Sequence, residues 1–279
     1  MNWDSIRKGE LKEIFDAVQD SCSVLGIDYY LIGAVARNIW YAREKKPFRE
    51  TRDVDFAVFV GNIMQYEGIR QYLKEHRGFQ DTKENAFVLR TSSGLQLDIL
   101  PFGGIEIDGE ITVAGIGLIS IGVNGFMEVY TEGTESIELE TDHPFEVATL
   151  PSIVLLKLIS FDDRPEIREK DARDIGNLIQ HYFDLQANFI YEHYSNLFSI
   201  EDDLLAQQSL QEIAAHVIGQ EIKKIIQHNP VLQRRIKRII KHFVTEKDQS
   251  PFVRGMVNET GQPVSEIIKW LHKMHIGLE

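Results

Sequence analysis

Two aspartates with one residue between them, Asp53 and Asp55, stand at the start of an apolar run that reads DVDFAVFV. Side chains two positions apart in a β-strand point to the same side of the sheet, so these carboxylates are expected to lie next to each other. The apolar residues that follow, 56 to 60, are typical of a central strand that is buried on both faces. Two ionised carboxylates repel each other, and a bound cation removes this repulsion. The pattern therefore predicts a cation site at the start of a buried strand.

A third carboxylate, Asp98, lies inside a second apolar segment, LQLDILPF, residues 95 to 102. Magnesium is held in proteins by one or two carboxylates, with water and substrate phosphates as its other ligands. Two such ions, about 3.5–4 Å apart, can hold the attacking and leaving oxygens of a phosphoryl transfer. We therefore interpret Asp53, Asp55 and Asp98 as catalytic residues and ligands of Mg²⁺, in a site expected to take two ions. The alternative is that the D-x-D pair only caps a helix or closes a turn, and Gly33 upstream and Asp98 downstream argue against it.

The residues before the pair predict a strand, a tight turn and a helix. Residues 29 to 33 read as a strand that ends in Gly33, and residues 34 to 43 as a helix whose first N–H groups can bind phosphate. Arg37, in the first turn of this helix, either reaches a bound triphosphate or is a solvated arginine. Arg52 ends a basic loop and adjoins the D-x-D pair, where its charge would neutralise substrate phosphates.

This order of residues resembles the DNA polymerase β-like nucleotidyltransferase superfamily. Its members have a Gly-Ser or Gly-Gly turn before a helix, D-x-D on the next strand and a third aspartate on a later strand. Gly33 matches the turn, and Asp53 and Asp55 match D-x-D, while Asp98 takes the place of the third acid. The wording LIGAVARNIW…TRDVDFAVFV is most similar to the AbiEii/AbiGii-type branch, which includes toxins of toxin–antitoxin systems. Ala34 stands where the superfamily prefers Ser or Gly, so its side chain cannot offer a hydroxyl to a phosphate, although backbone N–H groups can.

The resemblance extends to a later segment, where KL…DRPEIREKDARDI is similar to the "K…R…KD..Dl" motifs of the AbiEii-type branch. It implies that Lys157 contacts the triphosphate of the nucleotide and that Asp174 is the late acidic residue of the motif, with Asp171 as the alternative. The apolar helix around Lys157 supports a role for it, because a lysine there needs water or an anion for its amine. For Asp171 the competing interpretation is an acid at a helix N-terminus, or a pair with Arg168 or Lys170.

Length and composition are those of an ordinary soluble protein. At 279 residues the chain is expected to form two domains, residues 1–149 and residues 150–279. Its 43% hydrophobic and 26% charged residues include no run long enough to span a membrane, and its polar start predicts no signal peptide. A single cysteine, Cys22, excludes an internal disulfide framework and a Cys-based zinc site. We expect a cytoplasmic protein.

The remaining pattern predicts strands in the first domain and helices in the second. In the first domain, His143 is interpreted as a loop residue rather than a metal ligand. Helices are expected there at residues 4 to 25, ended by Gly26, and at 62 to 76. A hairpin is expected at 86 to 90 and 95 to 100. Short β segments are expected between 103 and 122, and strands at 127 to 130 and 137 to 139. In the second domain, helices are expected at residues 150 to 161, from about 170, and at 187 to 198, 201 to 217, 219 to 227, 230 to 246 and 263 to 274.

The charge of the chain is uneven. Its formal net charge is −13, from 30 basic and 43 acidic residues. This acidity argues against a large, sequence-blind nucleic-acid surface and suits a small cationic substrate or a basic protein partner. Residues 221 to 247 instead hold eight Lys or Arg and two Glu, a local net charge of +6. This segment either holds an RNA backbone or a triphosphate, or is a solvated helix face.

Together these features predict an α/β (α+β) fold, in which a nucleotidyltransferase mixed sheet with flanking helices is followed by a helical C-terminal domain, with the active site in the cleft between them. The predicted function is Mg-dependent transfer of a nucleoside monophosphate from an NTP to a hydroxyl acceptor. That acceptor is either the end of an RNA such as tRNA, as for a toxin, or a small molecule of the aminoglycoside type. Asp98 would be the third metal ligand or the base for the attacking hydroxyl. The nucleotide would be bound by Gly33, Ala34, Arg37, Arg52, Lys157 and Asp174.

Two further expectations concern partners and the competing class of protein. An antitoxin protein is the expected protein partner, and no membrane is expected to be involved. The competing class is a degenerate, non-catalytic module that binds a nucleotide or only a protein, and Ala34 is the departure that favours it.

Overall fold

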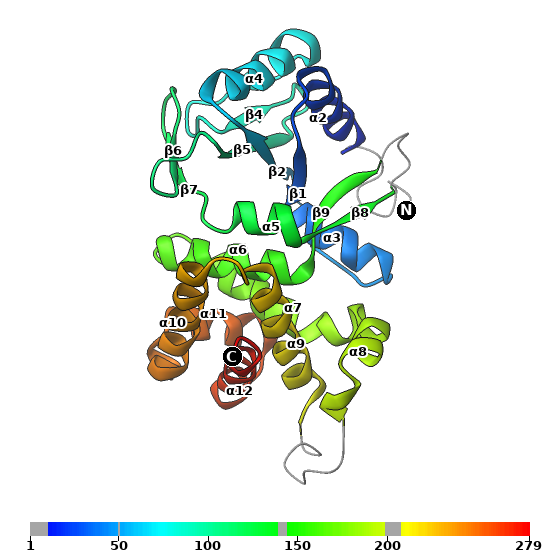
Figure 1. The fold of residues 1–279 in the computed structure, drawn as a ribbon, viewed down its shortest axis with the longest axis vertical. Helices are drawn as coiled ribbons and strands as arrows, with labels where there is room; N and C mark the ends of the chain where they lie inside the picture. Colours follow the sequence, from blue (N-terminus) through cyan, green and yellow to red (C-terminus); the bar gives the residue numbers. More distant parts are fainter. Residues whose placement is uncertain (1–10, 50, 139–143, 199–207) are drawn as a thin grey trace. The chain divides into compact units, whose positions relative to one another are not determined.

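The computed structural model describes residues 11–49, 51–138, 144–198 and 208–279 (Figure 1). The chain divides into two compact units, Met1–Thr149 and Leu150–Glu279. The described part of the first unit is a mixed α/β structure, and that of the second unit is helical. The predicted combination of a mixed sheet with flanking helices and a helical C-terminal part is confirmed.

Seven strands of the described residues form one mixed sheet in the first unit, in the order β3-β4-β5-β2-β1-β9-β8. The strand β2 runs parallel to β5 and antiparallel to β1, which is in turn parallel to β9. The predicted D-x-D strand, β2, is therefore in the middle of the sheet. The seven strands are β1 (Tyr29–Ile32), β2 (Asp53–Val60), β3 (Gln80–Asp81), β4 (Val88–Arg90), β5 (Gln96–Gly103), β8 (Thr134–Ile137) and β9 (Phe145–Ala148).

Helices cover both faces of this sheet (Figure 1). Four are described in the first unit: α2 (Lys12–Leu25), α3 (Gly33–Arg43), α4 (Ile63–Arg77) and α5 (Phe126–Glu132). On one face Phe15 of α2 packs edge-on against Phe56 of β2, with ring centroids 5.4 Å apart. On the other face Phe59 of β2 stacks on Tyr130 of α5, with centroids 5.3 Å apart. Alternate side chains of β2 are thus buried on opposite faces, as the unbroken apolar run predicts.

The first unit differs from the predicted pattern in several elements. Residues 127 to 130 were expected as a strand but belong to α5, because Phe126 and Val129, three residues apart, are the positions that face the core. The strand expected at 137 to 139 is β8, which ends at Ile137. Leu139 and the predicted loop residue His143 lie outside the described residues. Strand β9 was not predicted. The short β segments expected between 103 and 122 are β6 (Glu110–Thr112) and β7 (Ser120–Gly122), which form a separate two-stranded sheet.

The second unit consists of helices in its described part. The two helices expected at 201 to 217 and 219 to 227 are one helix, α9, which starts at a capping box between Ser209 and Glu212 and continues through Gly219. Residues 201 to 207 lie outside the described residues. Helix α11 was not predicted. The helices are α6 (Leu150–Asp163), α7 (Glu169–Leu185), α8 (Ala187–His193), α9 (Leu210–Ile225), α10 (Pro230–Glu246), α11 (Pro251–Thr260) and α12 (Val264–Gly277), with 3-10 turns η1 (Ser195–Phe198) and η3 (Lys247–Gln249).

Gly219 is kept inside α9 by its packing against α12. A Cβ atom added to Gly219 would lie 2.2 Å from the carbonyl oxygen of Met274, and one added to Gly277 would lie 2.2 Å from that of His216. Both contacts are with backbone atoms, which cannot move aside as a flexible side chain can. The two helices therefore approach closely because each places a glycine against the other.

Replacing Gly219 with alanine should lower the free energy of unfolding by roughly 1–3 kcal/mol, because the added methyl group separates α9 from α12. The matched control is Gly68 in the interior of α4, where an added Cβ would lie 3.8 Å from the nearest side-chain atom, of Leu25. Gly68→Ala should raise the stability by up to about 1 kcal/mol, since alanine has the better helix propensity. Urea unfolding followed by circular dichroism measures both. Equal midpoints for the two variants would contradict the close packing.

Candidate active site

The three predicted metal ligands lie on one face of the sheet. Strands β2 and β5 run side by side and parallel, with Asp53 opposite Gln96 and Asp55 opposite Asp98. Directly opposed residues of neighbouring strands point to the same face, and so do residues two apart in one strand. The carboxylates therefore stand together where both strands begin. Asp53 is exposed and the other two are half-buried, and Oδ1 of Asp98 is buried.

The turn from β1 into α3 lies directly against this group. Ile32, the last residue of β1, pairs with Asp55, and Gly33 then begins α3 with a positive φ of 71°. A Cβ atom at position 33 would lie 2.1 Å from Oδ2 of Asp55. Only glycine lets the backbone at the start of α3 approach the carboxylate this closely. A phosphate bound by the N–H groups of the helix start would therefore adjoin the carboxylates.

The carboxylates fit a hard divalent cation in their chemistry. Among residues 11–49, 51–138, 144–198 and 208–279, however, no group of three or more His, Cys, Asp or Glu side chains is arranged to hold a metal ion. Nε2 of Gln96 donates a hydrogen bond of 2.6 Å to Oδ1 of Asp53 and so engages one oxygen of that carboxylate. The directly opposed pair, Asp55 and Asp98, matches the usual protein contribution to a magnesium site, which is one or two carboxylates.

The predicted nucleotide-binding residues near this group differ in exposure. Arg37 lies on the buried side of α3 with 6% of its surface exposed, so the interpretation as a solvated arginine is wrong. Its Nη2 donates to Oδ1 of Asn38 over 3.1 Å. Ala34 is half-buried in the first turn. Arg52 is exposed immediately before β2, and its carbonyl accepts a hydrogen bond of 3.0 Å from the backbone of Gln96.

The predicted residues of the second unit form a buried ionic cluster. The Nζ atom of Lys157, on α6, lies 2.7 Å from a carboxylate oxygen of Asp171 and 2.8 Å from one of Asp174, both on α7. The three side chains are 15%, 9% and 18% exposed. Burial alone would lower the pKa of Lys157, but attraction to the two carboxylates outweighs it and raises that pKa above its ordinary value. Asp171 lies in the first turn of α7, as the competing interpretation of an acid at a helix N-terminus has it, and its ion pair is with Lys157.

Comparison with known proteins identifies the family of the chain. The model of the family described as the nucleotidyl transferase AbiEii toxin of a type IV toxin–antitoxin system matches residues 16–256. The chain belongs to this family. It is a nucleotidyltransferase, and the predicted resemblance to the AbiEii-type branch is confirmed over most of its length. None of the helices in the described part of this AbiEii-family chain is long and apolar enough to cross a membrane.

Two solved structures are similar to the AbiEii-family chain. One is an antigenic nucleotidyltransferase-like protein from Paracoccidioides brasiliensis, with 16% identity and a TM-score of 0.39 over 82% of this chain and 92% of that chain. The other is the solution structure of the antibiotic-resistance factor ANT(2'')-Ia, with 13% identity and a TM-score of 0.33 over 57% of this chain and 75% of that chain. No curated protein matches the chain. Neither similarity identifies a substrate.

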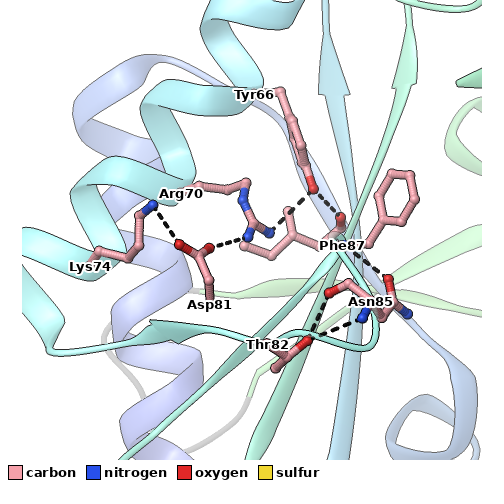
Figure 2. Close-up of polar contacts among 8 residues, drawn as sticks. Tyr66, Arg70, Lys74, Asp81, Thr82, Asn85 and Phe87 are labelled. Carbon is pink, nitrogen blue, oxygen red and sulfur yellow. Dashed lines mark hydrogen bonds and ion pairs between the residues drawn. The ribbon is translucent and has the colours of Figure 1, made fainter. Parts of the chain in front are cut away.

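In the AbiEii-family chain, a polar network that was not predicted ties α4 to the edge of the sheet (Figure 2). The guanidinium of Arg70 donates to a carboxylate oxygen of Asp81 over 2.6 Å, and Lys74 donates to the other over 3.0 Å. Burial alone would raise the pKa of Asp81, but the hydrogen bonds from Lys74 and Arg70 outweigh it and lower that pKa. The spacing of Tyr66, Arg70 and Lys74, each four residues apart on a helix, is the sequence signal that could have revealed this network.

The same network fixes the backbone that carries Asp98. The hydroxyl of Tyr66 donates to the carbonyl of Ile99 over 3.2 Å, and the N–H of Ile99 donates to the carbonyl of Phe87 over 3.0 Å. Figure 2 shows the turn before Phe87, where Oδ1 of Asn85 accepts a hydrogen bond of 2.9 Å from the N–H of Phe87. Both backbone groups of Ile99 are thus held from outside β5, directly beside the candidate ligand.

Replacing Gly33 with alanine should disturb the carboxylates as well as the fold. Gly78 is the matched control, because its φ is +70° against +71° at Gly33, yet nothing lies within 4 Å of its added Cβ. Both alanine variants should lose roughly 1–2 kcal/mol to left-handed strain. Only Gly33→Ala should also displace Asp55, and the transfer rate should fall about 10²-fold, as expected for a misplacement near 1 Å. Equal activity of the two variants would show that Gly33 does not position Asp55.

Replacing Tyr66 with phenylalanine removes one hydroxyl and leaves the carbonyl of Ile99 without this buried donor. We expect a loss of about 1–2 kcal/mol in the free energy of unfolding. We also expect the transfer rate to fall about 10-fold, the scale of a change next to a ligand. Tyr72→Phe is the control on the same helix, at a half-buried position where the ring contacts that of His76. Unfolding curves and rates equal to those of the control would count against the positioning role.

Proposed function

We propose that this chain transfers a nucleoside monophosphate from an NTP to a hydroxyl group at the end of an RNA such as tRNA, with Mg²⁺ as cofactor. The observation that carries the proposal is the alignment of Asp53, Asp55 and Asp98 on one face of two adjacent parallel strands, against the glycine that begins α3. Opposed carboxylates beside a helix N-terminus offer a cation site next to a phosphate site. This combination suits phosphoryl transfer, which depends on positioning and on neutralising charge.

The roles of the residues follow from their places. Asp55 and Asp98 would hold Mg²⁺, and Asp53 would be the third ligand of a two-ion site once its carboxylate exchanges the hydrogen bond from Gln96 for the ion. When bound, the cation would neutralise the phosphates and polarise the phosphoryl group. In the transfer, the acceptor oxygen forms a bond to the α-phosphorus, the bond from that phosphorus to pyrophosphate breaks, and the hydroxyl proton passes to Asp98 or to water. The backbone at Gly33 and Ala34 would bind the phosphates.

The other predicted residues would bind the nucleotide by charge. Arg52 is exposed next to the D-x-D pair and would neutralise a phosphate oxygen. Arg37 is buried in α3, so its side chain would stabilise the start of the helix rather than extend from it to the phosphates. Lys157 and Asp174, which lie 2.8 Å apart within the second unit, would be the remaining nucleotide-binding residues. In this assignment residues 1–149 are the nucleotidyltransferase core and residues 150–279 are a helical domain.

A small cationic acceptor of the aminoglycoside type is the second candidate. The net charge of −13 favours it, because an acidic surface attracts a polycation. The family description, a toxin of a type IV toxin–antitoxin system, supports an antitoxin protein as partner. With it we propose a toxin-like role in the cytoplasm, in which the acceptor is RNA. A module that binds nucleotide without transferring it is the third candidate, with Ala34 as its basis.

The test is transfer of label from NTP. The pure protein is incubated with Mg²⁺, total cellular RNA and each of the four α-labelled NTPs in turn, beside an Asp53→Asn/Asp55→Asn control. Label on RNA that is absent from the control supports the proposal and names the nucleotide. A parallel incubation replaces the RNA with an aminoglycoside, and label on the aminoglycoside but not on RNA would establish the second candidate. If no label moves and no NTP raises the melting temperature, the non-catalytic module is favoured.

A further inference from the structure

Helix α10 has one apolar and one basic face. Its buried residues are Leu232, Ile236, Ile239, Ile240 and Phe243. At 100° per residue, Arg234, Arg238 and Lys241 lie on the opposite, exposed side, and the half-buried Lys237 lies at its border; we call these four basic residues the basic stripe. The stripe covers about 10 Å of helix length. Because one helix holds all four residues, their spacing is fixed by the helix geometry.

Among the residues that the structure describes, the basic stripe has few acidic partners. Arg235, beside the stripe, donates hydrogen bonds of 2.8 Å to Asp162 and 2.5 Å to Asp163 of α6. Arg238 lies 3.6 Å from Asp162 and is 71% exposed. No ion pair joins Arg234, Lys237 or Lys241 to an acid in the part of the chain that the structure describes. The one acid of α10, Glu246, lies 3.4 Å from His242.

This arrangement favours a polyanion. Like charges three and four residues apart on a helix repel each other, and a bound polyanion relieves the repulsion. In the described part of the chain, Val231 is the one large apolar residue of α10 that is exposed, at 66%. The buried core of a protein interface is usually more apolar than the rest of the surface, whereas phosphates are bound by Lys and Arg without an apolar centre. The stripe therefore suits a nucleic-acid backbone better than an acidic protein.

We propose that the basic stripe of α10 binds the phosphate backbone of the RNA acceptor. This inference rests on the proposed function, since it assigns a surface to that acceptor. It also accounts for RNA binding by a chain with a net charge of −13, because the contact is confined to one helix face. A polycationic small acceptor would be repelled by the same face.

The test measures RNA binding without nucleotide. The probe is a fluorescein-labelled oligouridylate of about 20 nucleotides, followed by anisotropy over a range of KCl concentrations. The stripe variant is Arg234→Gln/Lys237→Gln/Lys241→Gln in the full chain. The control, Lys12→Gln/Lys83→Gln/Lys269→Gln, removes the same charge from α2, from the loop after β3 and from α12. It separates the stripe from the net charge.

The stripe variant should bind about 10²-fold more weakly at low salt, and the slope of log affinity against log salt should fall by about 2, at 0.7 per phosphate contact. The control should match the wild type. The charge-preserving variant Arg234→Lys/Lys237→Arg/Lys241→Arg should retain binding, which shows that a loss does not come from misfolding. An unchanged slope in the stripe variant, equal losses in the control, or no salt-dependent binding by the wild type would overturn the proposal.

Transfer from labelled NTP on the same variants distinguishes the two proposals. If the stripe variant labels RNA and binds oligouridylate as the wild type does, the stripe assignment fails and the proposed function stands. If no label moves in any variant, the proposed function fails, and the anisotropy result still decides whether the stripe binds RNA. If the stripe variant loses only the binding of an acidic protein partner, the stripe is a protein interface and the proposal is wrong.

Discussion

Asp55→Asn should reduce the rate of nucleotidyl transfer by about 10³-fold or more, without weakening the fold. Asp55 lies opposite Asp98 on the neighbouring strand, and its carboxylate packs against Gly33, where a Cβ atom would not fit. It is therefore the central one of the three carboxylates. Losing one preorganised charged group at such a site costs about 10²–10⁴ in rate. Removing one of two adjacent negative charges relieves repulsion, so stability should not fall. Label transfer measured over a range of Mg²⁺ concentrations gives the rate.

The matched control for this prediction is Asp108→Asn. Asp108 is an exposed turn residue with a positive φ of 53°, a conformation that asparagine tolerates well. The control makes the same chemical change in the same unit, away from the carboxylates. It should transfer label at the wild-type rate. Activity of Asp55→Asn within about twofold of this control would contradict a role for Asp55 in phosphoryl transfer.

Lys157→Met should lower the free energy of unfolding by about 3–5 kcal/mol, the usual loss when one partner of a buried ionic cluster is removed. Methionine has a similar length, so packing on α6 is largely kept while Asp171 and Asp174 lose the ammonium that lies 2.7 and 2.8 Å from them. Urea unfolding measures the loss. Lys269→Met is the control, because Lys269 pairs with Glu266 on the surface of α12 and is 55% exposed. Its unfolding midpoint should stay close to that of the wild type.

The pH dependence of this loss follows from the raised pKa of Lys157. A cation whose pKa is higher in the folded state than in the unfolded state contributes its full stability below the unfolded value. That contribution is lost as the pH rises through the pKa of Lys157 in the folded state, which lies above the ordinary lysine pKa of 10.5. The stability difference between wild type and Lys157→Met should therefore be constant at neutral pH and shrink in strong alkali. A difference that grows with pH would contradict the ionic cluster.

The central strand and its carboxylates could be predicted because local pattern and tertiary position agree there. A strand that is apolar on both faces belongs in the middle of a sheet, which is where β2 lies, and the alternation of Asp53 and Asp55 fixes the face they share. Gly33 was predictable as a turn residue. Its close approach to Asp55 was not, because the approach depends on the register of β1 against β2.

Other features depend on contacts between distant elements. Apolar residues near 126 to 130 fit a short strand or a helix equally well. In the structure Phe126 and Val129, one helical turn apart, are both buried, as a helix requires. Gly219 looks like a helix end in the sequence but is a packing site against α12. The pairing of Lys157 with Asp171 brings together two helices that Pro165 separates. Sequence patterns report local periodicity, and they do not show which surfaces meet.

The measurement that tests the account most directly is Mn²⁺ binding, read by electron paramagnetic resonance, with Mn²⁺ in place of Mg²⁺ and a non-hydrolysable NTP analogue present. It reports on the carboxylates without depending on the acceptor or on turnover. The wild-type chain should bind the ion, and Asp55→Asn should bind it at least about 10-fold more weakly, while Asp108→Asn binds as the wild type does. Equal binding by all three chains, or no binding by the wild type, would contradict the assignment of Asp53, Asp55 and Asp98 as the cation site.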